Sequence, residues 1–276
     1  MKKRSIFGNT WMLLCAIYLV LPLLLTVIYS VTSDWTSILP RGFTLKYYSE
    51  IFANGQFWMS ILRGIVISII PVIITCVFII LALYTTVVYQ PKLEKYIEML
   101  CMVPYTINGV LLATSVLATY AGSPTIFSNR IVMLVCIYCI GCLPVTFRGI
   151  RNNMYAVNVR QLIEAAEILG ASKLYAFIKV VVPCMVSGIM VSVLMCMATI
   201  FGDFAIIKII ASAQYETAQS YLYNARNMPI QGTSAVVTIL FIVTLALTLS
   251  VLFVQMRDKT KKAAVPVVEA VDDAKE

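Results

Sequence analysis

Apolar residues in this chain gather into six long runs that are separated by shorter polar segments. The runs cover about 11–31, 59–89, 97–120, 131–147, 184–210 and 235–256. A helix needs about 20 mostly apolar residues to cross the hydrocarbon core of a bilayer. The pattern therefore predicts an all-α polytopic membrane protein with six transmembrane helices, which form one domain over residues 1–256.

The composition supports this prediction. Of the 276 residues, 61% are hydrophobic and 12% are charged, whereas soluble domains are about 45–50% apolar and about 25% charged. The net charge of +8 comes from basic residues spread over loops and termini, so nucleic-acid binding is not indicated. The first run is longer than a signal-peptide core and lacks a small-residue cleavage site, so we expect an uncleaved first span.

The distribution of basic residues predicts the orientation. Most of the 21 Lys and Arg residues lie near the N-terminus, after the second and fourth runs, or in the C-terminal tail. Cytoplasmic loops carry an excess of these residues. We therefore expect both termini and the loop 158–183 to be cytoplasmic, with the charged tail 257–276 disordered.

The loop 158–183, between the fourth and fifth runs, has the pattern of two short amphipathic helices that meet at Gly170. Asn158 and Gln161 have the spacing of a capping box at the start of the first helix. Gly170 suits the left-handed position that ends a helix. The residues expected on one apolar face are Leu162, Ile163, Ala166 and Leu169.

The second helix of the loop is expected to begin at Ser172, whose side chain can cap it. Its apolar residues are Leu174, Phe177 and Ile178. Pro183 then fits the first turn of the next helix, where its missing N–H is not needed. From the residue pattern alone, the loop could dock on a partner protein or lie on lipid headgroups as an interfacial helix.

The same loop resembles the EAA loop of permease subunits in binding-protein-dependent type I ABC importers. The family pattern is Glu-Ala-Ala, three residues, Gly, nine residues and Ile-x-Leu-Pro. It is matched here by Glu164, Ala165, Ala166, Gly170 and Pro183, with valines at the Ile and Leu positions. The spacing is kept throughout, between apolar runs of the right length.

The resemblance implies that the chain is the permease subunit of an ATP-driven importer in a bacterial cytoplasmic membrane. By resemblance, the two loop helices dock in a groove of a cytoplasmic ATPase, where Glu164 pairs with a basic residue and Gly170 allows the turn. The other implied partners are a second permease subunit, identical or paralogous, and an extracytoplasmic substrate-binding protein.

Charged residues inside apolar runs are the candidates for the translocation path, because such charges are costly unless they are paired or face water. Arg63 and Asp203 are expected at similar depth, and our hypothesis is that Asp203 lines the path. The alternatives are a structural Arg63–Asp203 ion pair and, for Lys208, a side chain that reaches the interface. Asn108 is among the residues that break up the middle runs, where carbonyls can face a water-filled cavity, so it is a further path candidate. The alternative is a plain kink of a membrane helix.

Catalysis by this chain is not indicated. The sequence has no histidine, its thirteen carboxylates are mostly in loops, and no Gly-x4-Gly-Lys-Ser/Thr phosphate loop is present. We expect no catalytic residue, no cofactor and no metal, with ATP hydrolysed by a partner chain. Cys136, Cys139 and Cys142 have a metal-like spacing, but within an apolar run they are expected to pack as small hydrophobic residues, without disulfides.

The substrate is not fixed by the sequence. The segment 39–48 and the residues around Asp203 look similar to permeases of the polyamine, ferric-iron and aminophosphonate branch. Asp203 suits a cationic solute, whereas Arg63 and Lys208 suit a phosphonate, so these indications conflict. The alternative function is a stand-alone channel or secondary carrier, for which repeat symmetry between the two halves would be typical.

Overall fold

The computed structural model describes residues 6–34, 41–122, 124–211 and 214–264. The chain divides into two compact units. Unit 1 comprises Met1–Ile61 and Thr217–Val243, and unit 2 comprises Leu62–Glu216 and Thr244–Glu276. Two helices, α3 (Gly55–Val88) and α12 (Ile230–Ala264), begin in unit 1 and end in unit 2.

Unit 1 contains a small β-ribbon that the sequence did not predict. Strands β1 (Thr32–Asp34) and β2 (Arg41–Phe43) pair antiparallel, with Thr32 opposite Phe43. Gly42 has a φ of 69°, a backbone conformation that L side chains rarely adopt. The ribbon follows α1 (Ile6–Ser30), whose apolar side chains are exposed along most of its described length, as expected for a helix in lipid.

Two further helices complete unit 1, α2 (Lys46–Ala53) and α11 (Ala218–Ala225). Ser30 Oγ and Tyr48 Oη share a hydrogen bond of 2.6 Å, which joins α2 to the end of α1. Asn54 Nδ2 donates to Tyr221 Oη at 3.2 Å, and the Phe57 ring meets the Tyr221 ring edge-on. These contacts attach α2 to both α1 and α11.

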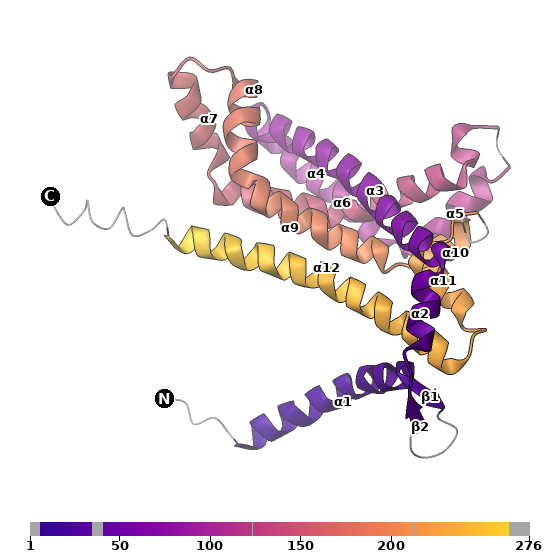
Figure 1. Cartoon of the computed structure of the whole chain (residues 1–276). Coiled ribbons are helices and arrows are strands. Elements are labelled where there is room, and N and C mark those ends of the chain that lie inside the picture. Colours follow the sequence, from indigo (N-terminus) through magenta and orange to yellow (C-terminus); the bar gives the residue numbers. More distant parts are fainter. Residues whose placement is uncertain (1–5, 35–40, 123, 212–213, 265–276) are drawn as a thin grey trace. The chain divides into compact units, whose positions relative to one another are not determined.

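Unit 2 carries the predicted functional residues (Figure 1). Besides most of α3 and the end of α12, its elements are η1 (Pro91–Leu93), α4 (Glu94–Met102), η2 (Val103–Thr106), α5 (Gly109–Tyr120), η3 (Ile126–Ser128), α6 (Arg130–Ala156), α7 (Val159–Ile168), α8 (Lys173–Ala176), the π-helical segment η4 (Phe177–Val181), α9 (Val182–Phe201) and α10 (Ala205–Ala211).

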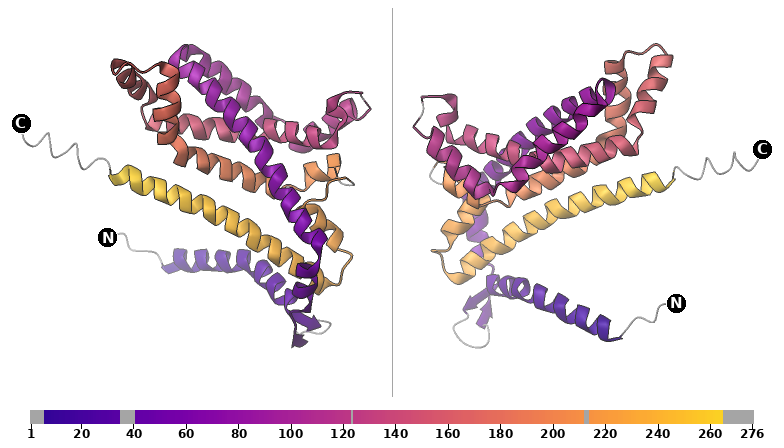
Figure 2. Two further views of the ribbon diagram at one scale, coloured as in Figure 1. Left: turned by 45° about the horizontal axis from the view of Figure 1, so that its top comes forward. Right: turned by 180° about the vertical axis from the view of Figure 1, so that it is seen from behind.

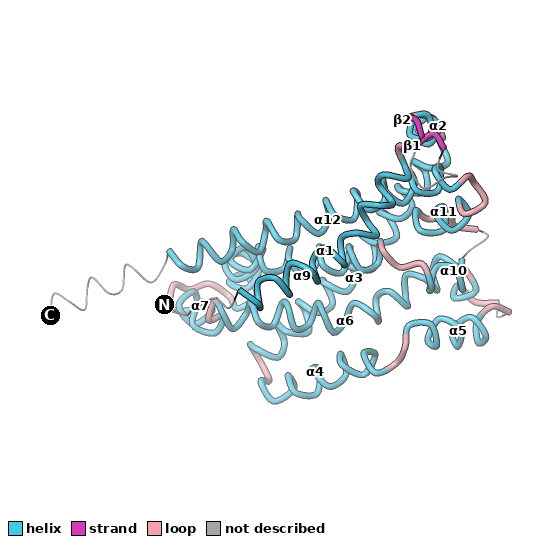
Figure 3. Tube along the Cα trace, turned by 90° about the horizontal axis from the view of Figure 1, so that it is seen from below, coloured by secondary structure: helices cyan, strands magenta, loops and turns pink. Residues whose placement is uncertain are grey.

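The described part of the chain has five helices long and apolar enough to cross a membrane. The pair of segments Pro91–Thr106 and Gly109–Tyr120 counts as a sixth span if the two are taken as one, and they meet at an angle of 89° (Figure 3). Pro104 in η2 and the extended backbone of Ile107 account for this break. The polytopic all-α prediction is confirmed, with its third span broken rather than straight.

Two predicted boundaries differ from the structure. The fifth run was expected to form one span over 184–210, but α9 ends at Phe201, and α10 starts afresh at Ala205. The charged tail was expected to begin at residue 257, whereas α12 continues to Ala264. Residues 265–276 lie outside the described part of the chain.

Helices α6 and α9 lie side by side along unit 2 (Figure 2). Their close approach depends on two glycines. A Cβ added to Gly149 would lie 1.8 Å from Ser192 Oγ, and one added to Gly188 would lie 1.9 Å from the Asn153 side chain. Small residues allow membrane helices to approach closely in this way. The two helices therefore form a tightly packed pair.

Candidate functional site

The turn from α6 into α7 is made by Asn158, in the left-handed conformation with φ 47° and ψ 56°. Its side chain makes no capping hydrogen bond, so the capping-box prediction for Asn158 and Gln161 is wrong. The reason is geometric. An N-cap residue needs an extended backbone, whereas Asn158 reverses the chain over a short turn, a conformation that asparagine tolerates better than most residues.

Gly170 ends α7 as predicted, with a φ of 84°. The Gly170 N–H donates to the Glu167 carbonyl at 2.9 Å, and the Ala171 N–H donates to the Ala166 carbonyl at 3.0 Å. This pair of bonds is a Schellman motif. Lys173 Nζ and Glu167 Oε1 are 3.6 Å apart across the turn. The turn is thus held by its own backbone and one ion pair.

The second half of the loop is continuous with the following span. Ser172 Oγ accepts a hydrogen bond from the Tyr175 N–H at 3.4 Å, which confirms the predicted cap. From Lys173 the chain stays helical to Phe201, through the π-helical η4. Pro183 lies in the first turn of α9, but η4 precedes it directly, so Pro183 does not start a separate helix.

Apolar side chains anchor the loop to unit 2 and also cover its tip. Val159 and Ile163 of α7 are buried in one hydrophobic cluster with Phe177. In contrast, Ile168 and Leu169 at the turn are 86% and 87% exposed. Leu169 was predicted to lie on one apolar face of α7 with Leu162, Ile163 and Ala166, but α7 ends at Ile168, and Leu169 is the residue after it.

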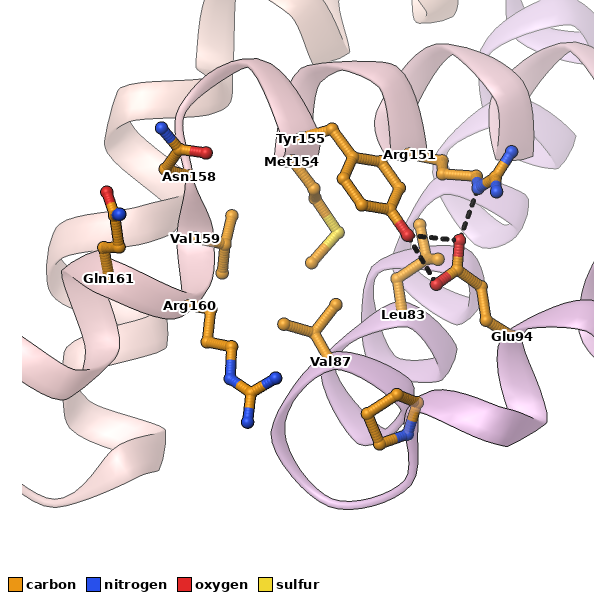
Figure 4. A pocket seen from close by; sticks show the side chains of 11 residues that line it. Leu83, Val87, Glu94, Arg151, Met154, Tyr155, Asn158, Val159, Arg160 and Gln161 are labelled. Atoms are coloured by element: carbon orange, nitrogen blue, oxygen red, sulfur yellow. Dashed lines mark hydrogen bonds and ion pairs between the residues drawn. The ribbon is translucent and has the colours of Figure 1, made fainter.

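A charged cluster that the sequence analysis missed joins α4 to the end of α6 (Figure 4). Arg151 Nε donates to Glu94 Oε1, and Tyr155 Oη lies 2.8 and 2.7 Å from the two Glu94 oxygens. Glu98 makes a longer contact of 3.4 Å with Arg151. The Glu94 side chain is only 15% exposed. We call Glu94, Arg151 and Tyr155 the brace.

The brace borders a cavity of about 360 Å³ that α7 closes on its other side with Arg160 and Gln161 (Figure 4). Arg160 is ion-paired with Glu164, one turn further along the same helix, at 3.2 Å. Four charges of the loop are therefore paired among themselves, Arg160 with Glu164 and Lys173 with Glu167. The only sequence signal for the brace was that Glu94, Arg151 and Tyr155 flank polar turns, which gave no indication that they meet.

Asp203 lies in the break between α9 and α10. Its Oδ1 accepts a hydrogen bond from the Ile206 N–H at 3.2 Å, so the carboxylate caps α10. Asp203 also lines a cavity of about 250 Å³ between α5, α6, η2 and α9. Among the residues that line this cavity, Asp203 is the charged one. We call this cavity the Asp203 pocket.

Tyr138 lines the same pocket and was not singled out from the sequence. The residue is 4% exposed, and its hydroxyl has no hydrogen-bond partner among the described residues. It lies within electrostatic reach of Asp203. A tyrosine in a run of apolar residues gave no signal, because tyrosine is also common in packed membrane helices.

Of the other predicted path residues, Arg63 lies away from the Asp203 pocket, whereas Asn108 stands between two residues that line it, Ile107 and Gly109. No ion pair joins Arg63 to Asp203 in the part of the chain that the structure describes. The Arg63 guanidinium lies 5.7 Å from the centre of the Tyr215 ring, and Tyr215 Oη donates to the Arg63 carbonyl at 3.2 Å. Asn108 caps α5, accepting from the Val110 N–H at 2.9 Å. The structure therefore groups Asp203 with Tyr138 rather than with Arg63.

The cysteines of α6 make packing contacts. Cys139 Sγ lies 3.6 Å from the Pro71 carbonyl, and the Cys139 carbonyl accepts from Thr75 Oγ1 at 3.2 Å. Both contacts join α6 to α3. Cys142 belongs to the buried apolar cluster around Ile137 and Ile200.

These features define a class of protein. Apolar helices of membrane-spanning length, a two-helix loop anchored to them at one end and a pocket with a half-buried acid are the parts of a transport permease. The family model for the binding-protein-dependent transport system inner membrane component matches residues 65–261. The chain belongs to this family and is a permease subunit of an ABC importer, not an enzyme.

Relatives and solved structures agree with this assignment. The chain is 21% identical over 241 residues to the 2-aminoethylphosphonate transport permease PhnV of Salmonella typhimurium, covering 87% of this chain and 90% of that protein. It is 21% identical over 251 residues to the spermidine/putrescine permease PotC of Escherichia coli K12, covering 88% and 91%.

The fold is also similar to that of a bacterial ABC transporter that imports alginate. The TM-score is 0.58 at 16% identity, with 96% of this chain and 97% of that chain covered. A second structure of an alginate transporter, with a periplasmic protein that carries an alginate pentasaccharide, gives a TM-score of 0.59 at 17% identity, covering 93% and 95%. At this identity the likeness shows the fold alone.

Proposed function

We propose that this subunit forms part of the path for a small solute that carries an amino group, and that the loop 158–183 couples the path to a cytoplasmic ATPase. The observation that carries the coupling role is the exposed apolar tip, Ile168 and Leu169. Two such side chains at a turn are unfavourable in water and favour insertion into a partner's groove.

The burial pattern of α7 argues against a helix that lies on lipid. An interfacial helix turns its apolar face toward the bilayer. Here that face, with Val159 and Ile163, is buried within unit 2. Glu164 is 59% exposed and pairs with Arg160 on its own helix. It is therefore available to exchange Arg160 for a basic residue of the ATPase.

The path role rests on Asp203, a carboxylate in a pocket with otherwise uncharged walls. By the same proposal, a second permease subunit completes the pore, a binding protein delivers the solute outside, and both termini are cytoplasmic. The printed substrates of PhnV and PotC, 2-aminoethylphosphonate and spermidine or putrescine, have an amino group in common. An acidic pocket favours that shared amino group. Ferric iron, the other cationic substrate of the polyamine, ferric-iron and aminophosphonate branch, is the alternative solute.

The coupling proposal is tested by purifying the tagged full-length chain in mild detergent from its native membrane and identifying the proteins that come with it. We expect an ATPase with the wild type, and about a tenfold loss or more with the double variant Ile168→Ser, Leu169→Ser. Glu164→Arg should weaken the association by removing its charge complementarity.

The matched control is Ile126→Ser, because Ile126 is exposed in η3, away from the loop, and should leave ATPase recovery unchanged. Recovery of equal ATPase with both loop variants would contradict the proposal. Transport by the purified chain alone in vesicles would favour a stand-alone carrier instead.

A further inference from the structure

The Asp203 pocket combines a single carboxylate, a buried hydroxyl and aliphatic walls. We propose that it is a subsite for the protonated amine at the end of a short aliphatic chain, with Asp203 as the counter-ion and Tyr138 as a second oxygen ligand. This inference rests on the proposed path role of Asp203 and specifies which end of the solute the pocket binds.

The charge of the pocket selects for a cation. Asp203 is the charged residue among those lining it, and among the described residues no lysine or arginine forms an ion pair with Asp203. A carboxylate among apolar walls is costly unless an opposite charge is near. Its bond to the Ile206 N–H fixes its orientation but supplies no charge. An ammonium group supplies the charge.

The Tyr138 hydroxyl gives independent support. A buried hydroxyl without a partner is unfavourable, and this one lies beside the same pocket. An ammonium group has three N–H donors, enough for both the carboxylate and the phenol oxygen. Because the hydroxyl is covered in this conformation, loading has to shift the side chains beside it.

The walls and size of the pocket suit methylene groups. Ile107, Leu112, Ile137, Ile200 and Ile206 line it, and its volume is about 250 Å³. A phosphonate would find no cationic side chain among these lining residues, and the Val110 N–H at the start of α5 is already bound by Asn108. A solute with both groups would therefore place its amine in this pocket and its anionic end outside it.

The test uses the purified full-length chain in nanodiscs of neutral phosphatidylcholine, which do not attract amines by charge. Four probes are titrated by saturation-transfer NMR: butane-1,4-diamine, n-butylamine, 1-butanol and ethylphosphonate. A charge-assisted contact is worth about 1.5–3 kcal/mol, so we expect the amines to bind at least about tenfold more tightly than butanol. Ethylphosphonate should bind no better than butanol.

Two variants separate the subsite from a structural role. Asp203→Asn keeps an oxygen for the Ile206 N–H but removes the charge, so amine binding should fall about tenfold or more. Tyr138→Phe should weaken amine binding about three- to tenfold. If the hydroxyl were only an unpaired structural group, its removal would leave binding unchanged and raise the melting temperature.

The matched controls are Glu50→Gln in α2 and Tyr96→Phe in α4, both exposed and outside the pocket, which should bind amines as the wild type does. Equal amine binding by Asp203→Asn, or butanol binding as tight as butylamine, would overturn the inference. ATPase copurification with Asp203→Asn separates the amine subsite from the coupling proposal, because this variant changes the pocket and leaves the loop intact. If the ATPase is recovered but amines do not bind the wild type, the subsite is wrong and the coupling proposal stands.

Discussion

The end of unit 2 that carries the loop 158–183 and the Asp203 pocket differ in how their polar groups are bonded. At the loop, Glu94 is bonded to Arg151 and Tyr155, Glu164 to Arg160 and Glu167 to Lys173, while apolar side chains are left exposed. In the pocket, the carboxylate of Asp203 has no cationic side chain among the lining residues, and the hydroxyl of Tyr138 has no hydrogen-bond partner among the described residues. At the loop, charges are neutralised by neighbouring opposite charges and apolar side chains are exposed, whereas no opposite charge lines the pocket of Asp203.

The largest effect is expected from separating α6 and α9, the helix pair that carries both regions. Gly188→Ala places a methyl group on the Asn153 side chain. Overpacking of this kind costs about 1–3 kcal/mol, so the melting temperature in detergent should fall, and both ATPase recovery and amine binding should decrease together.

The double variant Gly188→Ala, Asn153→Ala is the control for this prediction. Shortening Asn153 removes the group that the new methyl would meet, at the cost of its hydrogen bond to the Gly149 carbonyl. The double variant should be more stable than Gly188→Ala alone. A Gly188→Ala protein as stable as the wild type would show that the two helices can separate without cost.

A smaller and one-sided effect is expected from the brace. Glu94→Gln replaces charge-assisted bonds to Arg151 and Tyr155 by weaker ones, a loss of about 1–2 kcal/mol. We expect reduced ATPase recovery with unchanged amine binding. Glu98→Gln, whose contact with Arg151 is longer and more exposed, should lower stability by no more than about 0.5 kcal/mol. Loss of amine binding in Glu94→Gln would contradict the separation of the two regions.

Among the loop and brace variants, the smallest loss of ATPase recovery is expected at Gly170. Nothing lies within 4 Å of a Cβ added there, so only the positive φ opposes a side chain. Gly170→Ala should cost about 1–2 kcal/mol locally and reduce ATPase recovery modestly. Gly170→Asn should recover much of the loss, because asparagine tolerates this conformation. If Gly170→Ala and Gly170→Pro both recovered as much ATPase as the wild type, the Schellman turn would be dispensable for the association.

Features that depend on neighbouring residues were predictable from the sequence. The apolar runs gave the spans, the position of Gly170 gave the end of α7, and Ser172 gave the next cap. Each of these depends on the local period, on a missing Cβ or on a nearby hydroxyl. The Asn158 capping box failed because the chain has to reverse between α6 and α7, which the spacing of two residues does not reveal.

Features that depend on distant residues were not predictable. The brace joins Glu94 to residues more than fifty positions away. The pocket brings Tyr138 of α6 together with Asp203, which lies in the break between α9 and α10. Similar expected depth suggested Arg63 as the partner of Asp203, but depth does not fix which helix face a side chain occupies. Tyr215, outside any apolar run, provides the contact for Arg63 instead.

The unbroken helix from Lys173 to Phe201 fixes how its two ends are rotated relative to each other about the helix axis. Its 29 residues span about 43 Å and turn by about 100° per residue. The π-helical η4 sits near the loop end of this rod. Deleting one residue from the α-helical part of this rod would leave the Gly170 turn intact but rotate every later residue by about 100° around the axis. The number of residues between Lys173 and Phe201 thus sets the direction in which the chain leaves the rod toward Asp203.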